Sequence, residues 1–203
     1  MRKVATVLLI GILLGGCKRQ EEGRYIVSGS MQPTLQVNDR VFVNNTLNPT
    51  PGSVITLNSP HGFDEIMKSQ YSRRFCPLTE IPLIGRLFSD MMKNPACDVF
   101  IQRIVASSGD RVEVDGKGKV TVNGEVLKEA YVSNYCQVDI NGAGPCRTIK
   151  ATVPEGYVLT LGDNRANSWD GRFWPGGPFL PKSEIRGVVT QIWYPFERAK
   201  SLQ

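Results

Sequence analysis

Residues 99–124 read VFIQRIVASSGDRVEVDGKGKVTVNG, and this stretch carries the clearest indication of the fold. Three short runs rich in β-branched and aromatic residues (99–101, 112–114 and 119–122) alternate with turn residues, which is typical of short β-strands. The pair Asn123-Gly124 follows the third run, and Asn-Gly favours the positive φ angles of a two-residue hairpin turn. The stretch therefore predicts antiparallel strands with a hairpin at Asn123-Gly124.

The same pattern continues upstream of this stretch. Residues 41–43 and 54–57 form further strand-like runs, and turn residues such as Asn38-Asp39 and Pro51-Gly52 separate them. We therefore expect a mainly β protein built on antiparallel strands. A chain of 203 residues can hold one sizeable domain, or one domain with a small inserted one.

The overall charge is basic, at +5, but the basic residues are scattered. The runs are as short as Arg73-Arg74 and Lys117-Gly118-Lys119, so a solvated basic surface is favoured over a nucleic-acid patch. We expect no nucleic-acid partner, whereas a basic face suits the surface of an anionic membrane.

The N-terminal residues 1–17 have the features of an export signal. Arg2 and Lys3 precede an apolar stretch over 4–14, which is shorter than the roughly 20 residues that a membrane-spanning helix needs. Leu14-Gly15-Gly16-Cys17 then resembles a bacterial lipobox, which predicts lipidation at Cys17. The alternative is an uncleaved anchor helix. Both place the rest of the chain outside the cytoplasm, after a polar tether over 18–24.

Four cysteines remain after Cys17, and an even number in an exported chain indicates disulfides. Three pairings are possible, and the pairs closest in sequence are Cys76–Cys97 and Cys136–Cys146. A zinc site is disfavoured, because the chain has no Cys-x-x-Cys and its one histidine is His61. We expect no metal and no nucleotide cofactor.

Two segments carry residues with catalytic potential. The first is Ser-Gly-Ser-Met-Gln-Pro-Thr-Leu over 28–35, and the second is Gly-Asp-Asn-Arg-Ala-Asn-Ser-Trp-Asp-Gly-Arg over 162–172. A third segment lies between them, Phe-Ile-Gln-Arg-Ile-Val over 100–105, and Gly109-Asp110 follows it. In this order and spacing the segments resemble the motifs of type I signal peptidases, and the similarity runs over about 25–195.

The resemblance implies a role for each matching residue. Ser30 would be the nucleophile, and its N–H together with the Ser28 hydroxyl would form an oxyanion hole. Ser168 would orient the general base, and Asp170 and Arg172 would form a buried pair that organises these side chains. The other supporting residues are Asp163, Asn164 and Arg103.

Position 102 departs from the family pattern. The resemblance implies a neutral lysine there as general base, directly before Arg103, but this chain has Gln102. A glutamine amide cannot hold a proton near neutral pH. Smaller departures are Gly171 in place of serine and Ser107-Ser108 in place of an apolar-proline pair.

Three explanations for Gln102 stay open. A base comes from the segment 60–98, which contains His61, Lys68 and Lys93. Alternatively, the protein works slowly through its oxyanion hole and substrate binding alone. The third explanation is a pseudoenzyme that binds exported peptides without cutting them.

The resemblance implies a catalytic core over 25–110 and 152–203, with a small β subdomain inserted over 111–151. It also implies a serine endopeptidase, tethered to membrane lipid on the periplasmic face, that cleaves the signal peptides of exported preproteins, including specialised pilin or secretion substrates. The alternative function is a pseudoprotease that binds exported peptides in a secretion or conjugation assembly.

Overall fold

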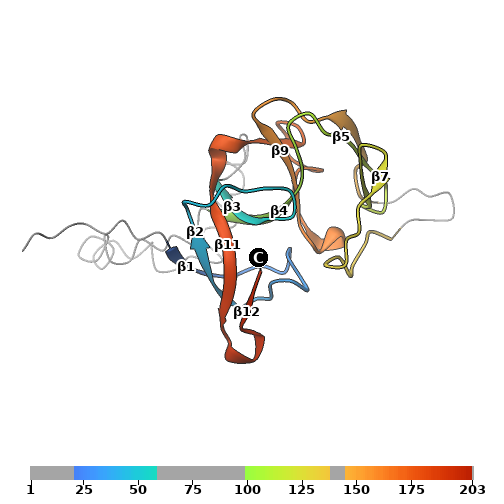
Figure 1. Ribbon diagram of the computed structural model, residues 1–203. Coiled ribbons are helices and arrows are strands. Elements are labelled where there is room, and N and C mark those ends of the chain that lie inside the picture. Colours follow the sequence, from blue (N-terminus) through green and yellow to red (C-terminus); the bar gives the residue numbers. More distant parts are fainter. Residues whose placement is uncertain (1–20, 59–98, 138–144, 203) are drawn as a thin grey trace, which may run out of the picture.

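The computed structural model of the chain describes residues 21–58, 99–137 and 145–202, and these residues form two antiparallel β-sheets (Figure 1). Among them, no helix is both long and apolar enough to cross a membrane. The expected mainly β, antiparallel architecture is thereby confirmed.

The larger sheet has eight strands in the order β1-β2-β11-β3-β4-β9-β10, with β12 paired to β11. Its strands are β1 (Glu21–Tyr25), β2 (Arg40–Asn44), β3 (Val54–Asn58), β4 (Val99–Ser107), β9 (Tyr157–Leu161), β10 (Phe179–Pro181), β11 (Ile185–Tyr194) and β12 (Lys200–Ser201). The long strand β11 lies between β2 and β3, as the red ribbon in Figure 1 shows. Short 3-10 helices follow at Arg165–Asn167, Lys182–Glu184 and Phe196–Arg198.

The smaller sheet has four strands in the order β7-β6-β5-β8. These are β5 (Arg111–Val114), β6 (Val120–Val122), β7 (Glu125–Val126) and β8 (Ile149–Thr152). The expected hairpin is confirmed, since β6 pairs with β7 and both Asn123 and Gly124 have positive φ, at 53° and 90°. This sheet occupies the region expected to be an inserted subdomain, although the division into domains stays a prediction.

The expected tether over 18–24 is wrong for residues 21–24. These residues form most of β1, which pairs in register with β2 from Glu21 opposite Asn44 to Tyr25 opposite Arg40. An edge strand of this kind is held by main-chain hydrogen bonds, so its polar sequence did not reveal it. The export segment 1–17, with Cys17, and the segment 60–98, with Cys76, Cys97 and the three candidate bases, lie outside the described residues.

Buried apolar side chains hold the turn over 28–35 against the larger sheet. Met31 and Leu35, at 2% and 0% exposed, pack in one cluster with Ile26, Val41 and Val189 and with other residues of β2, β3 and β11. Burial of two large side chains so close to Ser30 contributes about 1.5–3 kcal/mol each and leaves the turn little freedom.

A second apolar cluster joins the two sheets. Val105 and Leu159 from the larger sheet pack with Val112, Val120 and Ile149 from the smaller one. The smaller sheet is therefore fixed against β4 and β9. Strand β4 carries the candidate site residue Arg103, and β9 ends shortly before Asp163.

Gly187 tests the packing of β11 against β2. A Cβ added at Gly187 would come 2.7 Å from Val43 Cγ1 and 2.9 Å from the Asn44 carbonyl oxygen. We expect Gly187→Ala to lower the free energy of unfolding by about 1–3 kcal/mol, measured by urea denaturation, because the backbone of β2 must shift. Gly23→Ala in β1 is the matched control, since no atom lies within 4 Å of its added Cβ. Equal stability losses in the two variants would contradict this account.

Candidate active site

Ser30 lies in the turn between β1 and β2, and its hydroxyl faces that of Ser28. The two Oγ atoms are 3.1 Å apart, so either can donate a hydrogen bond to the other. The turn closes on itself through Gln32 N–H to the Gly29 carbonyl and Leu35 N–H to the Met31 carbonyl. The turn thus holds the hydroxyl groups of Ser28 and Ser30 within hydrogen-bonding distance of each other.

Asn164 fastens this turn to the loop that follows β9. Its main-chain N–H donates to the Ser30 carbonyl at 2.9 Å, and its side-chain Nδ2 donates to the Gly29 carbonyl at 2.9 Å. Gly162 allows this close approach, because a Cβ there would come 2.6 Å from the Ser30 carbonyl oxygen and would collide with Ser168 Oγ.

Ser168 therefore lies against Gly162 and near the main chain of Ser30. Its Oγ is buried and has no hydrogen-bond partner among the residues that the structure describes. An unpaired buried hydroxyl costs free energy, and such groups are uncommon in folded proteins.

Arg103 and Asp163 form a buried, bidentate ion pair. Arg103 Nε donates to Asp163 Oδ1 at 2.9 Å and its Nη2 donates to Oδ2 at 2.7 Å. Thr34 Oγ1 also donates to Oδ2, and Arg103 Nη1 donates to the Gly52 carbonyl at 2.7 Å. The pair thereby joins β4, the loop after β9 and the turn over 28–35, which we name the serine turn.

Tyr131 covers this ion pair, with its ring 4.0 Å below the Arg103 guanidinium carbon. Burial, followed by the nearby Glu129 carboxylate, raises the pKa of Tyr131 to about 12. The ring therefore stays neutral, and its π face remains available to the guanidinium.

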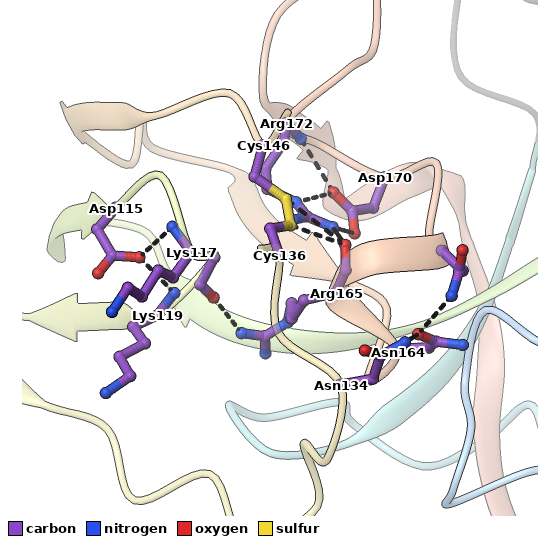
Figure 2. The surroundings of a disulfide bond; sticks show 12 residues. Asp115, Lys117, Lys119, Asn134, Cys136, Cys146, Asn164, Arg165, Asp170 and Arg172 are labelled. Carbon is purple, nitrogen blue, oxygen red and sulfur yellow. Dashed lines mark hydrogen bonds and ion pairs between the residues drawn. A yellow bond between two sulfur atoms is a disulfide. The ribbon is translucent and has the colours of Figure 1, made fainter. Parts of the chain in front are cut away.

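Asp170 and Arg172 form a second buried pair, with both side chains 0% exposed. Arg172 donates to the Asp170 carboxylate through Nε and Nη2, each at 2.8 Å, and Asp170 Oδ2 accepts the Gly162 N–H at 3.0 Å. Figure 2 shows this pair beside the disulfide between Cys136 and Cys146.

A third buried pair joins Arg165 to Glu129. Arg165 Nη2 and Nη1 donate to the two carboxylate oxygens at 2.6 and 3.1 Å, and Nη1 also donates to the Gly118 carbonyl at 2.6 Å. Burial disfavours the charge of Arg165, but the hydrogen bonds and charge of Glu129 outweigh it and raise the guanidinium pKa. The pair ties the loop after β9 to the segment that follows β7.

Gln102 is 2% exposed and lies in β4, opposite Ile55 of β3. Its Oε1 accepts from Thr160 Oγ1 at 2.7 Å, and its Nε2 donates to the Trp169 carbonyl at 3.1 Å. An amide suits this place, because it offers one acceptor and one donor without a buried charge. Neither Gln102 nor Ser28 can hold the Ser30 proton near neutral pH.

The structure thus brings several candidate residues together around the loop over 162–172. Ser30 and Gln102 both reach this loop, Ser30 through its carbonyl and Gln102 through its side chain. Arg103 with Asp163 and Asp170 with Arg172 are buried pairs, as the resemblance implied for the second.

Sequence reasoning missed four side chains that complete these contacts. They are Thr34, Glu129, Asn134 and Thr160. Each contacts a partner 30 to 129 residues away along the chain. Thr34 lies in the motif over 28–35 but received no role, and no local spacing pattern marks the other three. Cys136 and Cys146 form one of the two pairs that are closest in sequence; the other lies outside the described residues.

Fold and site together define a mainly antiparallel β protein that presents a serine on a turn fixed by buried ion pairs. A model of the family "Signal peptidase, peptidase S26" matches residues 2–194, and the chain belongs to this family.

Individual relatives agree with this assignment. Signal peptidase I of Leptolyngbya laminosa is 31% identical over 207 residues, covering 100% of this chain and 83% of that protein. Probable signal peptidase I-2 of Synechocystis sp. is 30% identical over 181 residues, covering 87% of this chain. Probable thylakoidal processing peptidase 2 of Arabidopsis thaliana is 33% identical over 178 residues, covering 86% of this chain. The chain spans 65% of the Synechocystis protein and 38% of the Arabidopsis one.

The Arg103–Asp163 pair can be tested by neutralising its acid. We expect Asp163→Asn to lower the free energy of unfolding by about 3 kcal/mol, because it leaves the Arg103 guanidinium buried without a counter-charge. Urea denaturation measures the change.

Glu113→Gln is the control for this variant. It breaks the pair with Lys150, whose side chains are 50% and 80% exposed, and exposed pairs contribute at most about 1 kcal/mol. A loss for Asp163→Asn no larger than that for Glu113→Gln would contradict a central role for the buried pair.

Proposed function

We propose that this protein is a serine endopeptidase of the signal-peptidase type, which removes signal peptides from exported preproteins with Ser30 as nucleophile. Membership of the signal peptidase family supports the reaction. The observation that carries the assignment of Ser30 is its position, with Ser28 Oγ at 3.1 Å and its carbonyl held by the Asn164 N–H.

In this proposal Ser30 Oγ attacks the carbonyl carbon of the scissile peptide bond. The negative charge that develops on the carbonyl oxygen is stabilised by the Ser30 N–H and the Ser28 hydroxyl. Donors fixed in this way contribute about 3–4 kcal/mol of transition-state stabilisation. Asp170 and Arg172 act further out: the Asp170 carboxylate accepts the N–H of Gly162, the residue against which Ser168 lies.

The proton of Ser30 needs an acceptor other than Gln102. We propose His61, Lys68 or Lys93 as this base, all in the segment over 60–98. Without any base the reaction would be slow, with the oxyanion hole and substrate positioning supplying the remaining acceleration.

The proposed substrate is a preprotein with small residues just before the cleaved bond, bound as an extended strand beside Ser28 and residues 100–101. A dedicated pilin or secretion substrate is one form of this proposal. We further propose that lipidated Cys17, as the first residue of the mature protein, tethers it at the outer face of the membrane.

A peptide-binding pseudoprotease is the second candidate, and Gln102 is the observation that favours it. Both polar atoms of its amide are already hydrogen-bonded, so this buried position is stable without a titratable group. A protein of this kind would hold exported peptides in a secretion or conjugation assembly without cutting them.

Cleavage of a preprotein by the full chain in detergent separates the two candidates. If the chain is an active peptidase, the wild-type protein cleaves the preprotein. Ser30→Ala then lowers kcat by at least about 10³-fold, because the nucleophile is lost. Binding of a labelled signal peptide, measured by fluorescence anisotropy, should remain in Ser30→Ala.

Substitutions at position 102 complete this experiment. If wild type is inactive and Gln102→Lys cleaves while Gln102→Met does not, the site lacks only its base and the pseudoprotease is supported. Gln102→Met matches the length of the side chain without a proton acceptor. Cleavage that persists in Ser30→Ala would contradict both candidates as stated.

A further inference from the structure

Residues 129–136, which we name the crossing segment, run from the smaller sheet across the loop over 162–172. Three of its side chains contact the site: Glu129 pairs with Arg165, Tyr131 stacks on Arg103, and Asn134 bonds to Asn164. The segment's own main chain is held by Ala166 N–H to the Asn134 carbonyl at 3.1 Å and by Cys136 N–H to the Lys117 carbonyl at 3.0 Å.

Asn134 makes the shorter of two hydrogen bonds that orient the Asn164 amide; the other runs from Asn167 Nδ2 to Asn164 Oδ1 at 3.3 Å. Asn134 Nδ2 donates to Asn164 Oδ1 at 2.8 Å, as Figure 2 shows. An amide carries its acceptor on one side and its donor on the other. With Oδ1 turned to Asn134, the Asn164 Nδ2 faces the Gly29 carbonyl, to which it donates at 2.9 Å.

Asn164 links Asn134 to two carbonyl groups of the turn over 28–35. The same Asn164 bonds to the Gly29 carbonyl through its side chain and to the Ser30 carbonyl through its main chain. These are the main-chain groups on either side of the Ser30 N–H, so their positions set the direction of that N–H.

We propose that Asn134 is a positioning residue, which orients the Asn164 amide and thereby fixes the main chain of Ser30. The inference rests on the proposed role of Ser30. It assigns to the crossing segment, which contains no strand, a part in the site itself.

The disulfide is the second part of this proposal, because it fastens the crossing segment two residues beyond Asn134. Arg172 Nη1 donates to Cys146 Sγ at 2.6 Å and to Cys136 Sγ at 3.5 Å, and its Nη2 donates to the Arg165 carbonyl at 2.9 Å. Figure 2 shows these contacts beside the Asp170–Arg172 pair. The end of the segment is thus joined to the buried pair that holds Gly162.

Two variants of Asn134 distinguish hydrogen bonding from space filling. Asn134→Ala removes the donor and keeps the main-chain bond to Ala166 N–H. Asn134→Asp keeps the shape but turns an acceptor toward Asn164 Oδ1, and a flip of Asn164 would then turn Oδ1 toward the Gly29 carbonyl. The proposal therefore expects Asn134→Asp to be at least as harmful as Asn134→Ala.

The measurement is hydrogen exchange of the amides over 28–35, followed by mass spectrometry, in the full chain. We expect exchange to increase about fivefold to tenfold in both variants, which corresponds to the loss of one hydrogen bond. Ser133→Ala is the control, because this neighbouring side chain is exposed, and its exchange should match wild type. Wild-type exchange in Asn134→Asp would overturn the proposal.

Cleavage kinetics give the functional result, in wild type or, if that is inactive, in Gln102→Lys. We expect Asn134→Ala to lower kcat about tenfold with KM changed less than about twofold. A rise of about tenfold in KM with kcat unchanged would overturn the positioning role. If neither background cleaves, the proposed function fails, while the exchange experiment still decides the role of Asn134.

The double variant Cys136→Ser with Cys146→Ser tests the disulfide. We expect exchange over 28–35 to rise as in Asn134→Ala, with circular dichroism confirming that the variant remains folded. Unchanged exchange over 28–35, in a folded variant, would overturn the part assigned to the disulfide. If the variant does not fold, wild type treated with a reducing agent provides the same comparison.

Discussion

The buried ion pair between Arg103 and Asp163 is the constraint on which the site depends. A guanidinium in the protein interior must find a carboxylate and further hydrogen-bond acceptors, or it destabilises the fold by several kcal/mol. Here the requirement is met only when β4, the loop after β9 and Thr34 of the serine turn come together. The charge of one arginine thus specifies the relative position of three segments that are far apart in sequence.

Gln102 shows how stability and reactivity separate at one position. A buried lysine is useful as a base because burial disfavours its charge, and the same burial makes it costly to the fold. The amide of Gln102 satisfies Thr160 and the Trp169 carbonyl with no charge at all. The surroundings of position 102 are therefore compatible with a folded, ordered site whether or not the chain catalyses hydrolysis.

Local patterns predicted strands β2 to β6 and the hairpin to β7, but not strands β8 to β12, and little of the polar network. The strand runs and the Asn123-Gly124 hairpin follow from alternation and from turn preferences over a few residues. Strand β1 was missed because its side chains are polar and its pairing is made by the main chain. The candidate site residues came from motifs, whereas Glu129 and Asn134 belong to a stretch with no motif. Their partners Arg165 and Asn164 lie 36 and 30 residues away, a distance over which local periodicity carries no information.

The place of β11 in the larger sheet has a consequence for the order of folding. This strand lies between β2 and β3, yet it is synthesised more than 120 residues after them. Until Ile185–Tyr194 is available, β2 and β3 have no common neighbour, and the Val41–Val189 cluster beneath the serine turn cannot close. The larger sheet therefore forms late, as a non-local assembly with a high loop-closure cost. Until then, the apolar side chains of β2 and β3 that pack on β11 remain uncovered, so the chain is most prone to aggregate in this interval.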